Sequence, residues 1–65
     1  MQVIVNGEAC ETEAVFLAEL VREQGVVPER VAVVQNEVVV PAAARATTHV
    51  QAGDRIELLT FAGGG

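Results

Sequence analysis

The sequence is poor in the features that reinforce small domains or attract charged polymers. Cys10 is the single cysteine, so no internal disulfide can form, which is typical of proteins in the reducing cytoplasm. Four basic residues stand against nine acidic ones, giving a net charge of −5 and no basic patch for nucleic acid. No apolar run reaches the roughly 18 residues of a membrane span, and the N-terminus lacks a signal-peptide pattern. We therefore expect a cytoplasmic protein without direct contacts to nucleic acid or membranes.

Motifs of self-sufficient enzymes are also missing. There is no Cys/His cluster for a metal, no phosphate-binding glycine loop and no Gly-x-Ser-x-Gly motif. We expect a single domain over residues 1–65, with little room for a deep substrate pocket. Cys10 as a redox thiol or sulfur donor, with His49 as its base, is an alternative that no spacing supports. We expect Cys10 to be a small hydrophobe and His49 a surface residue, and the chain to have no catalytic residue, metal or cofactor of its own.

A hairpin pattern opens the chain. Residues 2–5 and 8–11 are two short β-rich runs joined by Asn6-Gly7. This pair favours a type I′ turn, which needs a positive φ at both central positions. The first two strands are therefore predicted to be antiparallel neighbours.

A helix is expected to follow the hairpin. Thr12 is its predicted N-cap, with Glu13 in the first turn. The apolar face of this helix consists of Phe16, Leu17, Leu20 and Val21. Gly25 is expected to end the helix in a left-handed conformation.

Strand patterns dominate the second half of the chain. The expected elements are a strand at 30–35, a turn at Asn36-Glu37, a strand at 38–40 ended by Pro41, a short helical turn at 42–46, a turn at Gly53-Asp54 and a final strand at 55–61. This order predicts an α+β fold in which one helix packs across one face of a mixed sheet. It is the β-grasp, or ubiquitin-like, arrangement, with the first and last strands as central, parallel neighbours.

Alternation along the final strand assigns its side chains to two faces. The expected core residues are Val3, Val5, Leu17, Leu20, Val33, Ile56 and Leu58. The residues expected to face away from the helix are Arg55, Glu57, Leu59 and Phe61. Exposed apolar residues often mark a binding surface, so we predict a partner-binding face made of Glu57, Leu59 and Phe61.

Three glycines, Gly63, Gly64 and Gly65, follow the final strand and stand last in the sequence. Glycine adds nothing to a core, and a frayed terminus is the plain alternative. A glycine run can also thread a narrow channel and bring a terminal carboxylate into the active site of another protein. There the carboxylate could be activated as an acyl-adenylate with ATP. We expect Gly65 to carry the reactive carboxylate, and Gly63 and Gly64 to thread the partner's site.

Several short motifs occur together in this chain. They are Asn6-Gly7, Leu20-Val21, the run from Val31 through Asn36 to Pro41, Gly53-Asp54-Arg55-Ile56-Glu57, and Gly64-Gly65. Each motif alone is weak, but in this order they form a fairly specific set. With them the chain resembles, over essentially its full length, the ThiS family of sulfur carriers in thiamine biosynthesis.

The resemblance implies a set of partners. A ThiF-like adenylyltransferase would adenylate Gly65 with ATP, which the partner binds. A cysteine desulfurase or rhodanese-like donor would supply sulfur and convert Gly65 to a thiocarboxylate. A ThiG-like thiazole synthase would accept that sulfur. The carrier itself would act as a co-substrate and catalyse nothing.

Other members of the same superfamily remain alternatives. The family often has a basic residue after the proline and then a tryptophan, whereas Pro41 precedes three alanines here and the chain has no tryptophan. Molybdopterin synthase small subunits and carriers for cysteine synthesis or tRNA thiolation share the fold and the tail. A ubiquitin-like modifier would instead join Gly65 to a lysine of another protein. A plain β-grasp interaction module is a third class.

Overall fold

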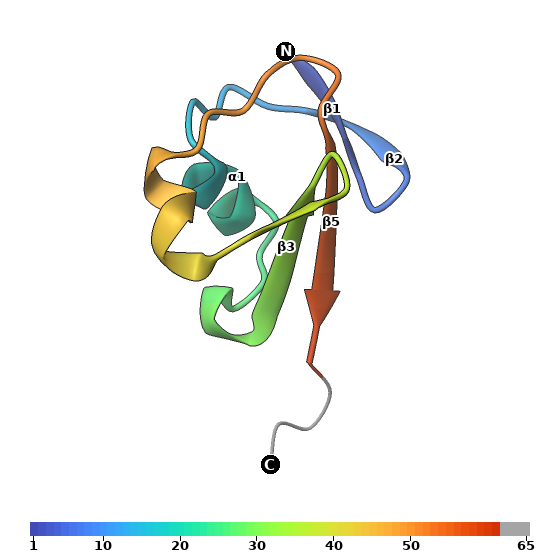
Figure 1. Cartoon of the computed structure of the whole chain (residues 1–65). Coiled ribbons are helices and arrows are strands. Elements are labelled where there is room, and N and C mark those ends of the chain that lie inside the picture. The colour runs from blue at the N-terminus through green and yellow to red at the C-terminus, as the bar shows by residue number, and fades with distance from the viewer. Residues whose placement is uncertain (62–65) are drawn as a thin grey trace.

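Two layers, a sheet and one α-helix, form the part of the chain that the computed structural model describes, residues 1–61 (Figure 1). The strands are β1 (Gln2–Val5), β2 (Glu8–Glu11), β3 (Val31–Gln35), β4 (Val38–Val40) and β5 (Arg55–Thr60). The helix is α1 (Leu17–Glu23), and two 3-10 helices are η1 (Pro28–Arg30) and η2 (Ala42–Thr47). Each strand lies within one residue of its predicted range. At seven residues, α1 is too short to cross a membrane, which takes about 20.

The sheet has the strand order β2-β1-β5-β3-β4, with β5 in the centre. Strand β1 pairs with β5 in parallel, through Ile4↔Arg55 and Val5↔Ile56. Strand β3 pairs with β5 antiparallel, and two hairpins add β2 and β4 at the edges. These pairings confirm the predicted β-grasp topology.

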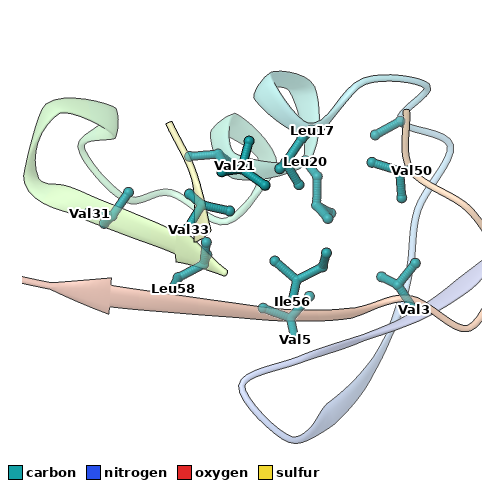
Figure 2. Packing of buried hydrophobic residues seen from close by; sticks show 12 residues of the cluster. Val3, Val5, Leu17, Leu20, Val21, Val31, Val33, Val50, Ile56 and Leu58 are labelled. Atoms are coloured by element: carbon teal, nitrogen blue, oxygen red, sulfur yellow. The ribbon is translucent and has the colours of Figure 1, made fainter. Parts of the chain in front are cut away.

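The core lies between the sheet and α1 (Figure 2). All seven predicted core residues are buried. The cluster also contains Ala14, Val21, Val31, Val40 and Val50. With no tryptophan or tyrosine in the chain, close-packed valines and leucines provide the burial that holds this small domain together.

Both hairpin turns need a left-handed backbone. Asn6 and Gly7 have φ values of 50° and 85°, which confirms the type I′ turn. Asn36 and Glu37 have φ values of 51° and 71°, so the second hairpin uses the same geometry without a glycine. At the end of α1, Gly25 has a φ of 75° and its N–H donates to the carbonyl of Arg22 at 3.2 Å, as predicted for a helix terminator.

The predicted start of the helix is wrong. Thr12 does not cap α1, and Glu13 is not in its first turn, because the helix begins at Leu17 with Phe16 as the N-cap residue. The Thr12 hydroxyl instead accepts the Ala14 N–H at 3.0 Å and donates to Glu23 at 2.7 Å. Thr12 therefore anchors the end of the helix rather than its beginning.

Tertiary pairing explains the later helix start. Leu17 donates its N–H to the carbonyl of Thr48 at 2.8 Å, and Val50 donates to the carbonyl of Val15 at 2.9 Å. These bonds hold the chain before α1 extended against residues 48–50. Glu19 then accepts both the Phe16 and the Val15 N–H, each at 2.9 Å, and these hydrogen bonds lower its pKa.

Candidate functional site

The candidate site lies at the C-terminal end of β5, the last strand before the glycines in the sequence. The last described residue, Phe61, donates its N–H to the carbonyl of Arg30 at 2.9 Å. This bond extends the β3–β5 pairing to the end of the described chain. The predicted reactive tail, Gly63, Gly64 and Gly65, lies outside the described residues. The structure therefore defines the platform from which the tail departs.

The side chains of β5 alternate as the sequence predicts. Ile56 and Leu58 are 1% and 7% exposed and lie in the core. Leu59 and Phe61 are 54% and 59% exposed, and Glu57 is also exposed. This confirms the predicted strand register and the outward orientation of these three residues; their role in binding a partner remains a prediction.

An apolar strip surrounds Leu59 on the face of the sheet away from α1, here called the open face. Leu59 lies opposite Ala32, and Val34 lies between Glu57 and Val39 in the sheet register. Val39 is 67% exposed. Sequence analysis missed Ala32, Val34 and Val39 as site residues, although the same alternation that was applied to β5 would have placed them on this face.

A shallow depression of about 320 Å³ lies on the open face beside the two hairpin turns. Gly7 and Glu37 from the turns, Ile4 from β1, and Arg55 and Glu57 from β5 line it. Two carboxylates and one guanidinium give it mixed charge, without a nucleophile beside a base. Residues 1–61 contain no group of three or more His, Cys, Asp and Glu side chains that could hold a metal ion.

Asn6 ends the parallel pairing of β1 with β5. Its N–H donates to the carbonyl of Ile56 at 2.8 Å. Its side-chain Oδ1 accepts the N–H of Leu58 at 2.9 Å, in the place of a further β1 carbonyl. Asn6 is thus a turn residue and a strand cap at once, and only its role in the turn was predicted.

Two of the motif segments prove to be one hydrogen-bonded network. Asp54 is buried and accepts hydrogen bonds from Gln35 at 3.0 Å, from Asn36 at 3.0 Å and from the Gln51 N–H at 2.8 Å. The Asn36 Oδ1 accepts the Arg55 N–H at 2.9 Å. Burial alone would raise the pKa of Asp54, but the hydrogen bonds from Asn36, Gln51 and Gln35 outweigh it and lower the pKa. The network fixes the start of β5 and has a structural role.

Cys10 and His49 are held by different contacts. Cys10 is half-buried against the core on β2, and the Gln24 side chain donates to its Sγ at 3.6 Å. His49 is exposed, and its ring lies 4.8 Å from that of Phe16. These positions agree with the expected small hydrophobe and surface histidine.

Arg45 is a buried charge that sequence analysis missed. It is 7% exposed, and its Nη1 and Nη2 donate to the carbonyls of Pro28 at 3.0 Å and Val31 at 2.7 Å. These bonds tie η2 to the segment that leads into β3. Nothing in the local sequence distinguishes this arginine from a surface residue, because its acceptors lie 14 and 17 positions away.

Comparison with known proteins bears on this platform and on the tail beyond it. The sequence model of the ThiS family matches residues 3–65. A thiazole synthase from Paramagnetospirillum magneticum is 38% identical over 66 residues, which cover all of this chain and 20% of that protein. The chain thus spans about a fifth of the length of that curated relative.

Two solved structures have the same fold. The crystal structure of the thiamine biosynthesis protein ThiS from Geobacter metallireducens has a TM-score of 0.84 at 33% identity, with both chains covered completely. A solution structure of a thiamine biosynthesis protein from the same organism has a TM-score of 0.81 at 33% identity, and covers all of this chain and 88% of the other.

Proposed function

The chain belongs to the ThiS family, and from this premise we propose that it carries sulfur for thiamine biosynthesis on the carboxylate of Gly65. The family match over residues 3–65 carries the proposal, since it includes the three glycines. The platform supports it, because β5 is the last strand before the glycines in the sequence and carries the exposed Leu59, next to the exposed Phe61. In this proposal the partner enzymes catalyse the reactions, and the carrier is their co-substrate.

Two steps make the thiocarboxylate. A carboxylate oxygen of Gly65 first attacks the α-phosphorus of ATP in the site of an adenylating enzyme, and pyrophosphate leaves. A sulfur nucleophile then attacks the acyl carbon, and AMP leaves with the bridging oxygen. The product has one carboxyl oxygen replaced by sulfur. ATP is bound by the adenylating enzyme, so the carrier needs no cofactor of its own.

Glycine at the last positions suits this reaction. A residue without Cβ adds no bulk beside the acyl carbon, and its backbone adapts to a narrow channel. With an ordinary α-carboxyl pKa of about 3.5, the terminal group is ionised and ready to attack at neutral pH. Cysteine is the proposed source of the sulfur, through a desulfurase or a rhodanese-like protein. When the persulfide of such a protein is the nucleophile, the product is an acyl disulfide, and a second thiol must reduce its S–S bond to release the thiocarboxylate; inorganic sulfide gives the thiocarboxylate directly.

We further propose thiazole synthase as the acceptor of the sulfur. The similarity of the whole chain to part of a protein named thiazole synthase supports this choice over a molybdopterin pathway. So does the structural similarity to thiamine biosynthesis proteins.

Intact-protein mass spectrometry tests the proposal. The protein is incubated with its adenylating enzyme, ATP and inorganic sulfide, and should gain the mass difference between sulfur and oxygen at Gly65. Deleting Gly65 should abolish the gain, and so should one residue added after Gly65, because the carboxylate is then misplaced. The mass of the protein isolated from cells shows whether its carboxylate is free.

Other outcomes would identify other functions. A protein modifier would be recovered as an amide on a lysine of a second protein. An interaction module would keep every activity, and not only partner binding, without Gly64 and Gly65. Either result would overturn the sulfur-carrier proposal and leave the fold unaffected.

A further inference from the structure

Strand β5 is covered along its full length on one side only. Its pairing with β3 runs from Ile56 to Thr60. Its pairing with β1 stops at Ile56. In Figure 1 the lower half of β5 extends past the β1–β2 hairpin, with β3 on one side and no described strand on the other. The central strand of the sheet therefore becomes an edge before it reaches the tail.

Hydrogen bonds show which backbone groups meet this edge. The Phe61 N–H and the Arg55 carbonyl bond toward β3, whereas the Asp54 and Ile56 carbonyls accept from β1. Because backbone groups alternate in direction along a strand, those of Leu58 and Thr60 point to the β1 side. Asn6 Oδ1 satisfies the Leu58 N–H at 2.9 Å. The Leu58 carbonyl and the N–H and carbonyl of Thr60 then face the side where β1 has ended.

We propose that this edge, Leu58–Thr60, receives an extended strand of the enzyme that activates the tail. The identity of the partner rests on the proposed function; the geometry of docking is the new inference. Free backbone groups at a sheet edge are a template for strand addition, in which main-chain hydrogen bonds provide affinity. Asn6 fits this reading, because it closes the pairing with β1 at the Leu58 N–H, and the groups that no described residue bonds begin at the carbonyl of the same residue.

Side chains beside the edge define the chemistry of the incoming strand. Leu59 and Phe61 are more than half exposed on the open face. An added strand would place alternate side chains next to them, and apolar residues there would bury both. Glu57 and the net charge of −5 favour basic residues at the rim of the same segment.

Strand addition at Thr60 would also aim the tail. Gly65 is five residues beyond Thr60, so its carboxylate can reach at most roughly 17 Å from the anchored backbone. The receiving strand of the enzyme must therefore lie within about that distance of its nucleotide. Anchoring the root of the tail reduces the conformational entropy that threading must overcome.

The outer edge at β4 is the natural comparison. Val38 and Val39 are 65% and 67% exposed, and the backbone groups of Val39 point away from β3. This strand has only three residues and is followed by Pro41, and both features disfavour the addition of another strand at this edge. It therefore serves as an internal control.

Matched proline and alanine variants test the proposal. Thr60→Pro and Thr60→Ala both remove the side chain, but only proline removes the N–H that faces the edge. Titration calorimetry with the adenylating enzyme should give an affinity at least about tenfold weaker for Thr60→Pro than for Thr60→Ala. The pair Val39→Pro and Val39→Ala should differ by less than about twofold, because no strand is added at β4. Equal affinities for the Thr60 pair, or a large difference for the Val39 pair, would overturn the proposal.

Amide hydrogen exchange on the unmodified protein gives a second readout if Thr60→Pro does not fold. The Thr60 amide should exchange quickly in the free protein and become at least about tenfold slower in the complex. The Leu59 amide, bonded to β3, should be slow in both, and the Val39 amide fast in both. A Thr60 amide that is already slow in the free protein, or one that stays fast in the complex, would contradict strand addition. Sulfide incorporation at Gly65, measured by mass, separately reports whether the sulfur-carrier function holds.

Discussion

Two adjacent leucines in β5 allow a sharp test of the fold and the site together. Leu58 is 7% exposed in the core, and Leu59 is 54% exposed on the open face. Both change to alanine with the same loss of atoms. Leu58→Ala should lower the free energy of unfolding by about 2–5 kcal/mol, because it leaves a cavity between the sheet and α1. Leu59→Ala should lower it by about 1 kcal/mol or less, because much of that side chain is already in water.

The size of the first effect matters in so small a domain. At about 0.05–0.15 kcal/mol per residue, a chain of 65 residues has a total stability of roughly 3–10 kcal/mol. Leu58→Ala could therefore remove half of the total, and some of the molecules could be unfolded without denaturant. Leu59→Ala should stay folded and lose affinity for the adenylating enzyme instead.

Urea titration followed by circular dichroism is the suitable assay, since the chain has no tryptophan or tyrosine for fluorescence. With a slope near 1 kcal/mol/M, a loss of about 3 kcal/mol moves the midpoint by about 3 M. Leu59→Ala should move it by about 1 M or less. Equal shifts for the two variants, or a larger one for Leu59→Ala, would show that the register of β5 is wrong.

Three further predictions concern single side chains. Asn6→Gly keeps the left-handed turn but loses the bond to Leu58, and should cost about 1 kcal/mol in urea titrations; Asn6→Ala should cost about 1 kcal/mol more, because of its positive φ. Asp54 has a folded pKa below its ordinary value of 3.8, so its stabilising effect is complete above that value and is lost as pH falls through the folded pKa. Asp54→Asn should flatten this acid dependence of the urea midpoint; an unchanged profile would contradict the assignment. Phe61→Ala should remain folded and bind the adenylating enzyme at least about tenfold more weakly, and unaltered binding would exclude Phe61 as an anchor.

Local patterns were sufficient for most of the elements. The type I′ turn at Asn6-Gly7 needs only two residues, and the alternation in β5 only six. Both predictions are confirmed, because short-range backbone geometry decides them. The order of the elements then leaves few topologies for a single helix on a mixed sheet, and the β-grasp is one of them.

Features that depend on distant partners were not predicted. Thr12 has the residue type of an N-cap, yet pairing of Val15 and Leu17 with residues 48–50 delays the helix. The bonds of Arg45 to backbone carbonyls, and of Asn6 to Leu58, join residues far apart in the chain. Hydrogen bonds between residues far apart in the chain leave no repeating pattern in a single sequence, so they could not be predicted from it.

The motif residues divide along the same line. Asn36 and Asp54 lie in the motifs by which the chain resembles the family, but their hydrogen bonds fix the start of β5. The residues proposed for function, Leu59, Phe61 and the glycines, follow from exposure and position. The motifs that contain Asn36 and Asp54 therefore stabilise the fold that supports the site, and do not supply its reactive group.

The central position of β5 determines when the protein can fold during its synthesis. Val5 and Ile56 are neighbours in the sheet but about fifty residues apart in the chain, a separation that slows folding. Before β5 is synthesised, the β1–β2 and β3–β4 hairpins are the only strand pairs of the sheet that can form. Isolated hairpins are at best marginally stable. A nascent chain that stalls within β5 would therefore present no folded sheet to its partners. Because the strand that completes the sheet directly precedes the glycine segment, a chain that ends within β5 would lack both the complete sheet and the glycines.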